Sequence, residues 1–129
     1  ANVALCGPPN LIPDNIINLG VKVNYNIDEV IEWADAVNVL RIQRERMGIG
    51  IIPSEREYRT LFGVTEERLA RRGNELVIMH PGPMNRDIEI ESSLADSKQS
   101  VILRQVANGV AVRMSLLSEL AKNYGTENE

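Results

Sequence analysis

Residues Val21 to Leu40 read VKVNYNIDEVIEWADAVNVL. Apolar and polar side chains alternate over residues 21–25, and this period of two predicts a strand with one wetter face. Asp28 is then expected to cap a short helix. The helix side chains that we expect to face inward are Val30, Ile31, Trp33 and Ala34. Residues Ala36 to Leu40 follow as an apolar strand, so the stretch predicts one parallel strand, helix and strand unit.

Comparable elements surround this unit. The further elements that we expect are a strand over residues 3–6, a helical segment over 13–19 closed by Gly20, a strand over 76–79 and an amphipathic helix over 101–122. Strands that are nearly continuous in apolar residues are typical of a parallel sheet covered on both faces. The sequence therefore predicts an α/β protein with three layers, α/β/α.

The segment between Arg41 and Glu75 breaks this alternation. Ser54 and Thr65 each precede a charged run with a glutamate at or near the position that completes a capping box, so each predicts a helix start. We expect a long, partly mobile excursion from the sheet. The side chains expected to anchor it are Tyr58, Leu61, Phe62 and Leu69.

The predicted long helix contains a conflict. Its apolar stripe consists of Val106, Val110, Leu117 and Leu120. Arg113 falls inside this stripe, where an unpaired buried charge is costly, so we expect Arg113 to be buried against a carboxylate of Glu89 or Asp96. Gly109 in the helix interior indicates close packing at that turn, by a crossing helix or by a ligand.

The composition is that of one soluble domain. The 129 residues are 43% hydrophobic and 25% charged with a formal net charge of −4, so no basic surface argues for nucleic acid or an anionic membrane. Cys6 is the single cysteine and His80 the single histidine, which leaves no internal disulfide and no multi-histidine or C-x-x-C metal site. No apolar span or leader is visible. We expect a cytoplasmic protein that uses no metal.

Two strand ends carry candidate binding residues, because ligands of open parallel sheets bind at the carboxyl ends of the strands. Arg41 and Gln43 follow the strand that ends at Leu40, and an extended chain would put them on one face. A guanidinium fork and an amide suit a small molecule that carries carboxylates. The alternative is a solvated basic stretch without a ligand.

The second strand end is followed by His80-Pro81-Gly82-Pro83. Two prolines remove two backbone donors and leave carbonyls available to a ligand. We expect the Gly82-Pro83 bond to be cis, a conformation largely confined to proline. His80 is either a structural hydrogen-bonding group or a proton carrier. Arg86 and Glu89, three residues apart, could pair with each other or help to shape the same cleft.

Several motifs occur together in a familiar order. They are RIQRER at 41–46, IPS at 52–54 with Tyr58, HPGPMNR at 80–86 with Glu89, and QVANG at 105–109 with Arg113. In this combination the chain resembles the aspartate carbamoyltransferase family, from Val3 to about Leu120, in the carboxy-terminal, aspartate-binding part of the catalytic chain. The related ornithine enzymes have H-C-L-P where His80 to Pro83 stand, so the aspartate enzyme is the better match.

The resemblance implies a Rossmann-like transcarbamoylase domain and the conversion of carbamoyl phosphate and L-aspartate to N-carbamoyl-L-aspartate and phosphate, in pyrimidine synthesis. The substrate-binding residues that it implies are Arg41, Gln43, Arg46, Pro81 and Gly82. Arg41 and Gln43 would hold the aspartate carboxylates and orient the amine. Arg46 would belong to a mobile loop that closes over the site. Pro81 and Gly82 would offer carbonyls to the carbamoyl nitrogen. The implied reaction needs no metal and no organic cofactor.

Part of the family's catalytic chain has no counterpart in this sequence. The carbamoyl-phosphate domain is absent, and the chain begins one strand and one helix into the aspartate domain. We therefore expect an aspartate-binding domain over 1–124, a disordered tail over 125–129, a gap within the sheet, and neither turnover nor a monomeric state for the chain alone. The whole enzyme would be a homotrimer. The alternatives are a non-catalytic amino-acid-binding or assembly module with this fold, or another transcarbamoylase.

Overall fold

The computed structural model describes residues 1–43, 54–72 and 76–126. Strands and helices alternate along the first half, as the sequence predicts. The strands are β1 (Ala4–Cys6), β2 (Lys22–Asn24), β3 (Ala36–Asn38) and β4 (Val77–Met79). The helices are α1 (Ile27–Trp33), α2 (Glu55–Phe62), α3 (Glu66–Ala70), α4 (Ser92–Ala95) and α5 (Ile102–Thr126). The fold class α/β is confirmed.

A short 3-10 turn over Pro9–Leu11 precedes the helical segment expected over residues 13–19. That segment is itself only a second 3-10 turn, over Ile16–Leu19. Gly20 closes the second turn with φ 73°, in the left-handed region that glycine adopts without strain, so the predicted end of this segment is confirmed.

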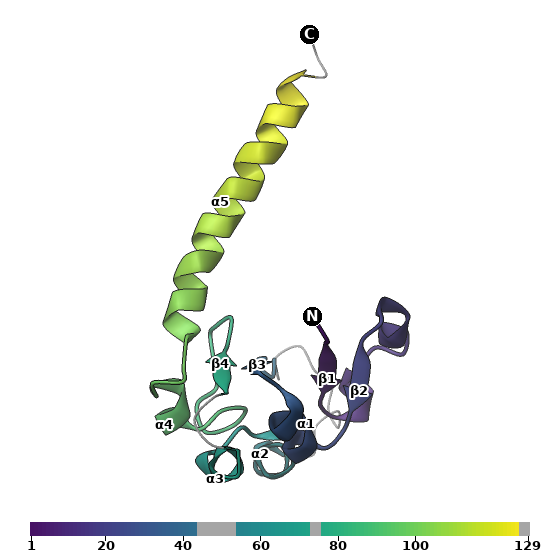
Figure 1. The fold of residues 1–129 in the computed structure, drawn as a ribbon, viewed down its shortest axis with the longest axis vertical. Coiled ribbons are helices and arrows are strands. Elements are labelled where there is room, and N and C mark those ends of the chain that lie inside the picture. The colour runs from purple at the N-terminus through teal and green to yellow at the C-terminus, as the bar shows by residue number, and fades with distance from the viewer. Residues whose placement is uncertain (44–53, 73–75, 127–129) are drawn as a thin grey trace.

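The strands form two parallel pairs. β1 pairs with β2, with Leu5 opposite Val23, and β3 pairs with β4, with Val37 opposite Ile78. Figure 1 shows the two pairs next to each other, and the described residues form no hydrogen-bonded ladder between them. The resemblance implied a gap within the sheet. In the structure the two pairs are separate, with β1 and β2 in one and β3 and β4 in the other.

The core lies around β4 and α1. Ile78 on β4 is fully buried, and Leu76 just before the strand is 1% exposed. Ile31 of α1 is 2% exposed, and Ile90 is also fully buried in the same cluster. Each fully buried side chain of this size contributes about 1.5–3 kcal/mol relative to an exposed one.

Helix α1 differs from its prediction at two residues. Its N-cap is Asn26, whose side chain accepts a hydrogen bond from the Asp28 backbone N–H, so the cap stands two residues earlier than expected. The inward positions Ile27, Val30, Ile31 and Ala34 are spaced by three and four residues. Trp33 lies off this stripe and is 46% exposed, so its predicted inward placement is wrong.

The caps of α2 and α3 are confirmed. Ser54 Oγ accepts from the Glu57 N–H at 3.0 Å, and Thr65 Oγ1 accepts from the Arg68 N–H at 3.4 Å. Each cap supplies a partner for one of the backbone donors that a helix start leaves unpaired. Among the expected anchors Leu69 is buried, whereas Leu61 is 51% exposed and does not anchor the segment.

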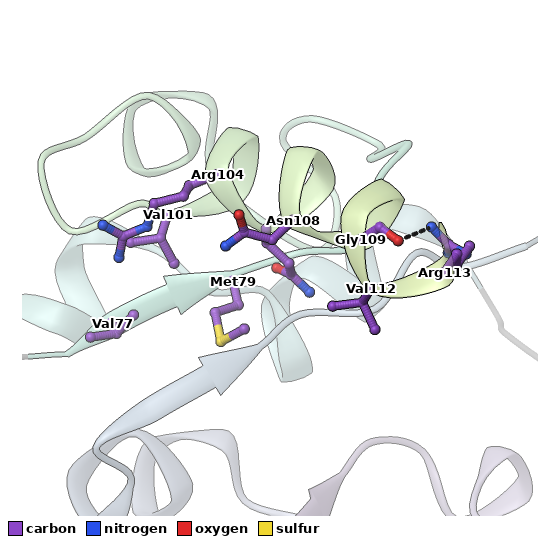
Figure 2. Close-up of a pocket in the computed structure, with 9 residues that line it drawn as sticks. Val77, Met79, Val101, Arg104, Asn108, Gly109, Val112 and Arg113 are labelled. Atoms are coloured by element: carbon purple, nitrogen blue, oxygen red, sulfur yellow. Dashed lines mark hydrogen bonds between the residues drawn. The ribbon is translucent and has the colours of Figure 1, made fainter. Parts of the chain in front are cut away.

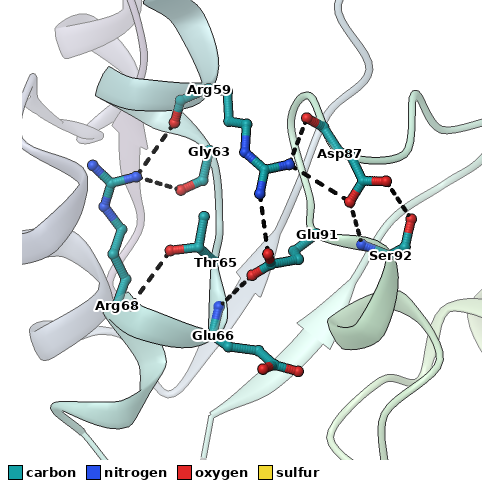
Figure 3. A network of polar contacts seen from close by, with 8 residues as sticks. All are labelled: Arg59, Gly63, Thr65, Glu66, Arg68, Asp87, Glu91 and Ser92. Carbon is teal, nitrogen blue, oxygen red and sulfur yellow. Dashed lines mark hydrogen bonds and ion pairs between the residues drawn. The ribbon is translucent and has the colours of Figure 1, made fainter. Parts of the chain in front are cut away.

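A polar network joins α2 and α3 to the loop that leads into α4 (Figure 3). Arg59 on α2 donates to the Asp87 carbonyl at 2.7 Å and to Glu91 Oε1 at 3.0 Å. Glu91 Oε2 in turn accepts from the Glu66 N–H at 2.8 Å. Asp87 accepts from the Ser92 N–H and hydroxyl, which lowers the pKa of its carboxyl. The network fixes the loop after β4 from the side of α2.

Helix α5 runs away from the rest of the chain as a single long rod (Figure 1). The side chains of its predicted apolar stripe are exposed, with Val110 at 56% and Leu117 at 68%. The helix extends to Thr126, two residues into the tail that we expected to be disordered, and residues 127–129 lie outside the described residues.

The prediction for Arg113 is wrong. Arg113 is exposed on α5, and its guanidinium donates to the Gly109 carbonyl at 3.1 Å one turn earlier. The two carboxylates that we expected as its partners contact other residues: Glu89 lies against His80, and Asp96 forms an ion pair with Arg86. Because α5 leaves the body of the described chain, its stripe is not buried and Arg113 needs no buried carboxylate.

Within residues 1–43, 54–72 and 76–126, none of the helices is both long and apolar enough to cross a membrane. The same part of the chain holds no group of three or more His, Cys, Asp or Glu side chains arranged to bind a metal ion.

Candidate functional site

The chain leaves β3 and β4 at the same edge of their shared ladder. Val39 N–H donates to the Met79 carbonyl at 2.9 Å, so the two strands end together. Arg41 therefore follows one strand end and His80 to Pro83 the other. This edge is where an open parallel sheet binds ligands.

Asn85 connects the two strand ends. Its Nδ2 donates to the Ile42 carbonyl at 3.0 Å, and its Oδ1 accepts from Arg41 Nε at 3.5 Å. The structure thus brings the predicted binding residue Arg41 against the loop that contains Gly82. Ile42 is buried and Arg41 is half-buried, so the chain just after β3 packs against the protein.

His80 is fully buried behind this loop. Its Nδ1 accepts from the Gly82 N–H at 2.9 Å, and its Nε2 lies 3.4 Å from Glu89 Oε1. Its backbone N–H donates to Gln105 Oε1 at 2.7 Å. Because Nδ1 is an acceptor, the proton of the neutral ring belongs on Nε2, toward Glu89. Both ring nitrogens and the backbone N–H of His80 thus face the protein.

Burial lowers the pKa of His80, and this effect outweighs the nearby Glu89 carboxylate, which acts in the opposite direction. His80 is thus a neutral ring at pH 7 that faces no solvent. Of the two roles that the sequence left open, the geometry favours the structural one. Burial also raises the pKa of the Cys6 thiol to about 11, so Cys6 is not an activated nucleophile.

The turn at Gly82 has the conformation that we predicted. The Gly82-Pro83 peptide bond is cis, and Gly82 has φ 65°. A side chain at position 82 would thus be strained, although a Cβ there would lie 3.6 Å from its nearest neighbour, Val106 Cγ2. Pro81 is exposed and Gly82 is half-buried, so this part of the loop reaches the surface.

Gln105 joins the start of α5 to both strands. Its Oε1 accepts from His80 N–H, and its Nε2 donates to Asn38 Oδ1 at 3.3 Å. One amide thereby ties the end of β3 to the end of β4. The sequence placed Gln105 in a motif but predicted no role for it.

Arg86 does not pair with Glu89, which was one of the two possibilities that the sequence left open for these residues. Arg86 forms a two-pronged ion pair with Asp96, with Nη1 and Nη2 at 2.7 Å and 2.9 Å from its carboxylate oxygens. Glu89, 1% exposed, instead accepts from the Asn85 N–H and faces His80. A separation of three residues brings side chains together on a helix, whereas the chain after Arg86 forms a turn over residues 87–89.

The remaining predicted residues are placed only in part. Gln43 is half-buried, two residues beyond Arg41. Arg46 lies outside the described residues, so its proposed place on a closing loop stays a prediction. Pro81 and Gly82 follow β4 on the loop that Asn85 ties to Arg41.

A separate groove of about 600 Å³ lies between β4 and the first half of α5 (Figure 2). Its walls are mostly apolar, with Val77 and Met79 on the strand side and Val101 and Val112 on the helix side. Arg113 folds back over Gly109 at one end of the groove. The apolar lining does not suit a dicarboxylate, which favours the strand ends as the candidate site.

Comparison with known proteins identifies the family. The model of the Asp/Orn binding domain of aspartate/ornithine carbamoyltransferase matches residues 8–120. The chain belongs to this family. The Arg41 and His80 to Pro83 segments both lie within the matched part, so the resemblance predicted from the motifs is confirmed.

Curated relatives of the aspartate/ornithine carbamoyltransferase family are similar over nearly the whole chain. The aspartate carbamoyltransferase catalytic subunit of Gemmatimonas aurantiaca is 56% identical over 121 residues, which cover 94% of this chain and 38% of that subunit. The subunit of Carboxydothermus hydrogenoformans is 52% identical over 122 residues, 94% of this chain and 39% of the relative. The chain therefore spans about two fifths of the length of these relatives.

Solved carbamoyltransferase structures share the fold. Aspartate transcarbamoylase from Trypanosoma cruzi, in complex with carbamoyl phosphate, superposes with a TM-score of 0.72 at 22% identity, covering 89% of this chain and 39% of that one. Ornithine carbamoyltransferase from Pyrococcus furiosus gives a TM-score of 0.71 at 19% identity, covering 92% and 41%. Both support the α/β assignment, including the Rossmann-like character that the resemblance implied.

Proposed function

We propose that this chain supplies the aspartate-binding part of an aspartate carbamoyltransferase catalytic chain, which joins carbamoyl phosphate to L-aspartate in pyrimidine biosynthesis. The products are N-carbamoyl-L-aspartate and phosphate. The observation that carries the proposal is the contact of Arg41 with Asn85, because it brings a carboxylate-binding side chain to the loop of Pro81 and Gly82. The 56% identity to a catalytic subunit supports the same reading.

In this proposal each strand end has one task. Arg41 and Gln43 bind the carboxylates of L-aspartate, since a guanidinium fork matches two carboxylate oxygens. The carbonyls of Pro81 and Gly82 accept hydrogen bonds from the carbamoyl nitrogen. Arg46, which lies outside the described residues, is a third side chain that binds substrate in this proposal. The aspartate amine is thereby held toward the carbamoyl carbon.

The reaction then depends mainly on orientation and charge. The amine lone pair forms a bond to the carbamoyl carbon, the bond from that carbon to the phosphate oxygen breaks, and the amine loses a proton. Fixing two anions in this geometry removes much of the entropic barrier, and positive groups stabilise the charge on the departing phosphate. We propose that the rest of the catalytic chain supplies the phosphate site, in a cytoplasmic homotrimer.

The proposal is tested with the full catalytic chain that carries this sequence. Arg41→Ala should raise the KM for L-aspartate by about 100-fold, the loss expected for a charge-assisted contact, and change the KM for carbamoyl phosphate little. Arg71→Ala, which removes an exposed arginine after α3, is the matched control and should leave both constants unchanged. An unchanged KM for aspartate in Arg41→Ala would refute the site.

The second candidate within this family is an enzyme that uses a different amino acid. The matched family model covers both aspartate and ornithine enzymes. Turnover with L-ornithine in place of L-aspartate would establish that alternative. Turnover with neither, together with binding of a dicarboxylate, would indicate a non-catalytic binding module.

A further inference from the structure

The loop from His80 to Glu89 is anchored at several points by buried groups. Gly82 N–H donates to His80 Nδ1, and Asn85 N–H donates to Glu89 Oε1. His80 and Glu89 are 0% and 1% exposed, and their side chains face each other. The backbone on both sides of Pro83 is thus held by one buried pair, which makes the loop a fixed platform.

Asn85 links this loop to the chain that follows β3. Its two side-chain contacts reach Ile42 and Arg41, more than 40 residues earlier in the chain. The Ile42 carbonyl requires a donor and Arg41 Nε requires an acceptor. Only one orientation of the amide satisfies both, with Nδ2 on the carbonyl and Oδ1 on the guanidinium.

The contact involves a particular atom of Arg41. Asn85 accepts from Nε, whereas a carboxylate can be bound by the two terminal Nη groups of the same guanidinium. A hydrogen bond at Nε restricts rotation of the planar group about its last side-chain bonds. It therefore reduces the conformational freedom that Arg41 would otherwise lose on binding a ligand.

We propose that Asn85 is a positioning residue for the amino-acid substrate, because its side-chain amide fixes the Arg41 guanidinium and the end of β3 against the loop after β4. The inference rests on the proposed function, in which Arg41 binds L-aspartate. Asn85 does not touch the substrate in this scheme and acts through Arg41. Glu89 and His80 support it by fixing the backbone from which its side chain extends.

The first experiment measures both Michaelis constants in the full catalytic chain. Asn85→Ala should raise the KM for L-aspartate about tenfold, as expected for the loss of a hydrogen bond to a charged group, with less than a twofold change for carbamoyl phosphate. Asp96→Ala, which breaks the exposed ion pair of Arg86 near the same loop, is the control and should change neither constant. Equal changes for both substrates would overturn the proposal, since a distorted loop would affect both.

A double-mutant cycle tests whether Asn85 acts through Arg41. Arg41→Lys keeps the positive charge but removes Nε, the atom that Asn85 contacts. Adding Asn85→Ala to Arg41→Lys should therefore raise the KM for aspartate by less than about twofold, against about tenfold in the unmodified chain. Independent effects that multiply in the double variant would overturn the proposal.

A second variant covers the case in which Asn85→Ala does not fold. Asn85→Asp keeps the shape but turns an acceptor toward the Ile42 carbonyl and places a negative charge beside Arg41. Its KM for aspartate should rise at least as much as that of Asn85→Ala, and a normal KM would refute the proposal.

If Arg41→Ala itself leaves the KM for aspartate unchanged, the proposed function fails. If Arg41→Ala raises it and the Asn85 variants do not, only the role of Asn85 fails.

Discussion

His80 Nε2 lies 3.4 Å from Glu89 Oε1, and both side chains are almost completely shielded from water. A buried imidazole and a buried carboxylate are costly to place together unless their remaining polar atoms have partners. The Gly82 and Asn85 backbone N–H groups supply two of these partners. The pair therefore holds the candidate site in place by its hydrogen bonds to the loop.

The first prediction is a pH-dependent stability that His80 causes. Burial lowers the pKa of His80 in the folded chain below its ordinary 6.5, so on acidification the unfolded chain takes up this proton first. The free energy of unfolding should decrease as the pH falls below about 7, by at most about 1.4 kcal/mol per pH unit. Urea unfolding at several pH values, at one fixed protein concentration, measures this decrease.

His80→Gln is the control for this prediction, because it removes the titrating group. In this variant the free energy of unfolding should depend less on pH below about pH 7. The lowered pKa values of Asp87 and Asp96 act in a separate, more acidic range, where their stabilising charges are lost as pH falls through the folded-state values. If the free energy of unfolding depends on pH in the same way in His80→Gln and in the original chain, His80 is not the group that causes the dependence.

The second prediction compares two glycines. A Cβ at Gly63 would lie 2.6 Å from the Arg59 carbonyl oxygen and 3.1 Å from the Ile88 carbonyl oxygen, both backbone atoms that cannot rotate away. Gly63→Ala should destabilise the chain by about 1–3 kcal/mol, the usual cost of overpacking. Gly7→Ala meets nothing within 4 Å and should change stability by less than about 1 kcal/mol. Equal denaturation midpoints for the two variants would contradict the prediction, because the backbone at the end of α2 would then accommodate the added methyl group at little cost.

Local signals in the sequence predicted much of the fold. Ser54 and Thr65 cap helices where expected, since a cap bonds within three residues of itself. Gly20 ends its turn for a similarly local reason. The parallel direction of the strands followed from their apolar runs and the order of elements, although the sequence did not predict which strands pair. Each of these features depends on nearby residues or on a simple repeat.

Features that depend on distant residues were not predictable in the same way. The buried partner expected for Arg113 assumed that the whole apolar stripe of α5 packs on the sheet, whereas only the start of α5 contacts β4 and the turn with Arg113 is exposed. Asn85 follows Met84 in an irregular loop without periodicity, and its partner Arg41 is 44 residues away. No local pattern marks such a contact. The motifs thus indicated where the site lies, and the structure was needed to show what supports it.

The third prediction concerns Arg68, which closes the end of α2. Its guanidinium donates to the Gly63 carbonyl at 2.6 Å and the Thr60 carbonyl at 2.7 Å, and Nε contacts Asp28 at 3.0 Å. The side chain is 16% exposed, so these bonds are partly shielded from water. Arg68→Ala should lower the free energy of unfolding by about 2–4 kcal/mol, because it leaves helix-end carbonyls without donors.

Arg68→Lys separates charge from geometry. One ammonium group cannot reach three partners that lie around a planar fork, so lysine should restore less than half of the lost stability. Arg71→Ala, which removes an exposed arginine after the next helix, α3, should cost less than about 0.5 kcal/mol. Chemical denaturation of the three variants measures the differences, and full recovery with lysine would show that charge alone matters.

The last prediction is that the chain alone self-associates through α5. The helix exposes Leu103, Met114 and Leu117 at 85%, 66% and 68%, and contiguous apolar surface of this kind favours association in water. Leu117→Lys should weaken association by about tenfold or more, since burying one leucine contributes about 1.5–3 kcal/mol. Ser115→Lys adds the same charge on another face of α5 and should leave the association constant nearly unchanged. Sedimentation equilibrium over a range of concentrations measures both, and a chain that stays monomeric throughout would disprove the prediction.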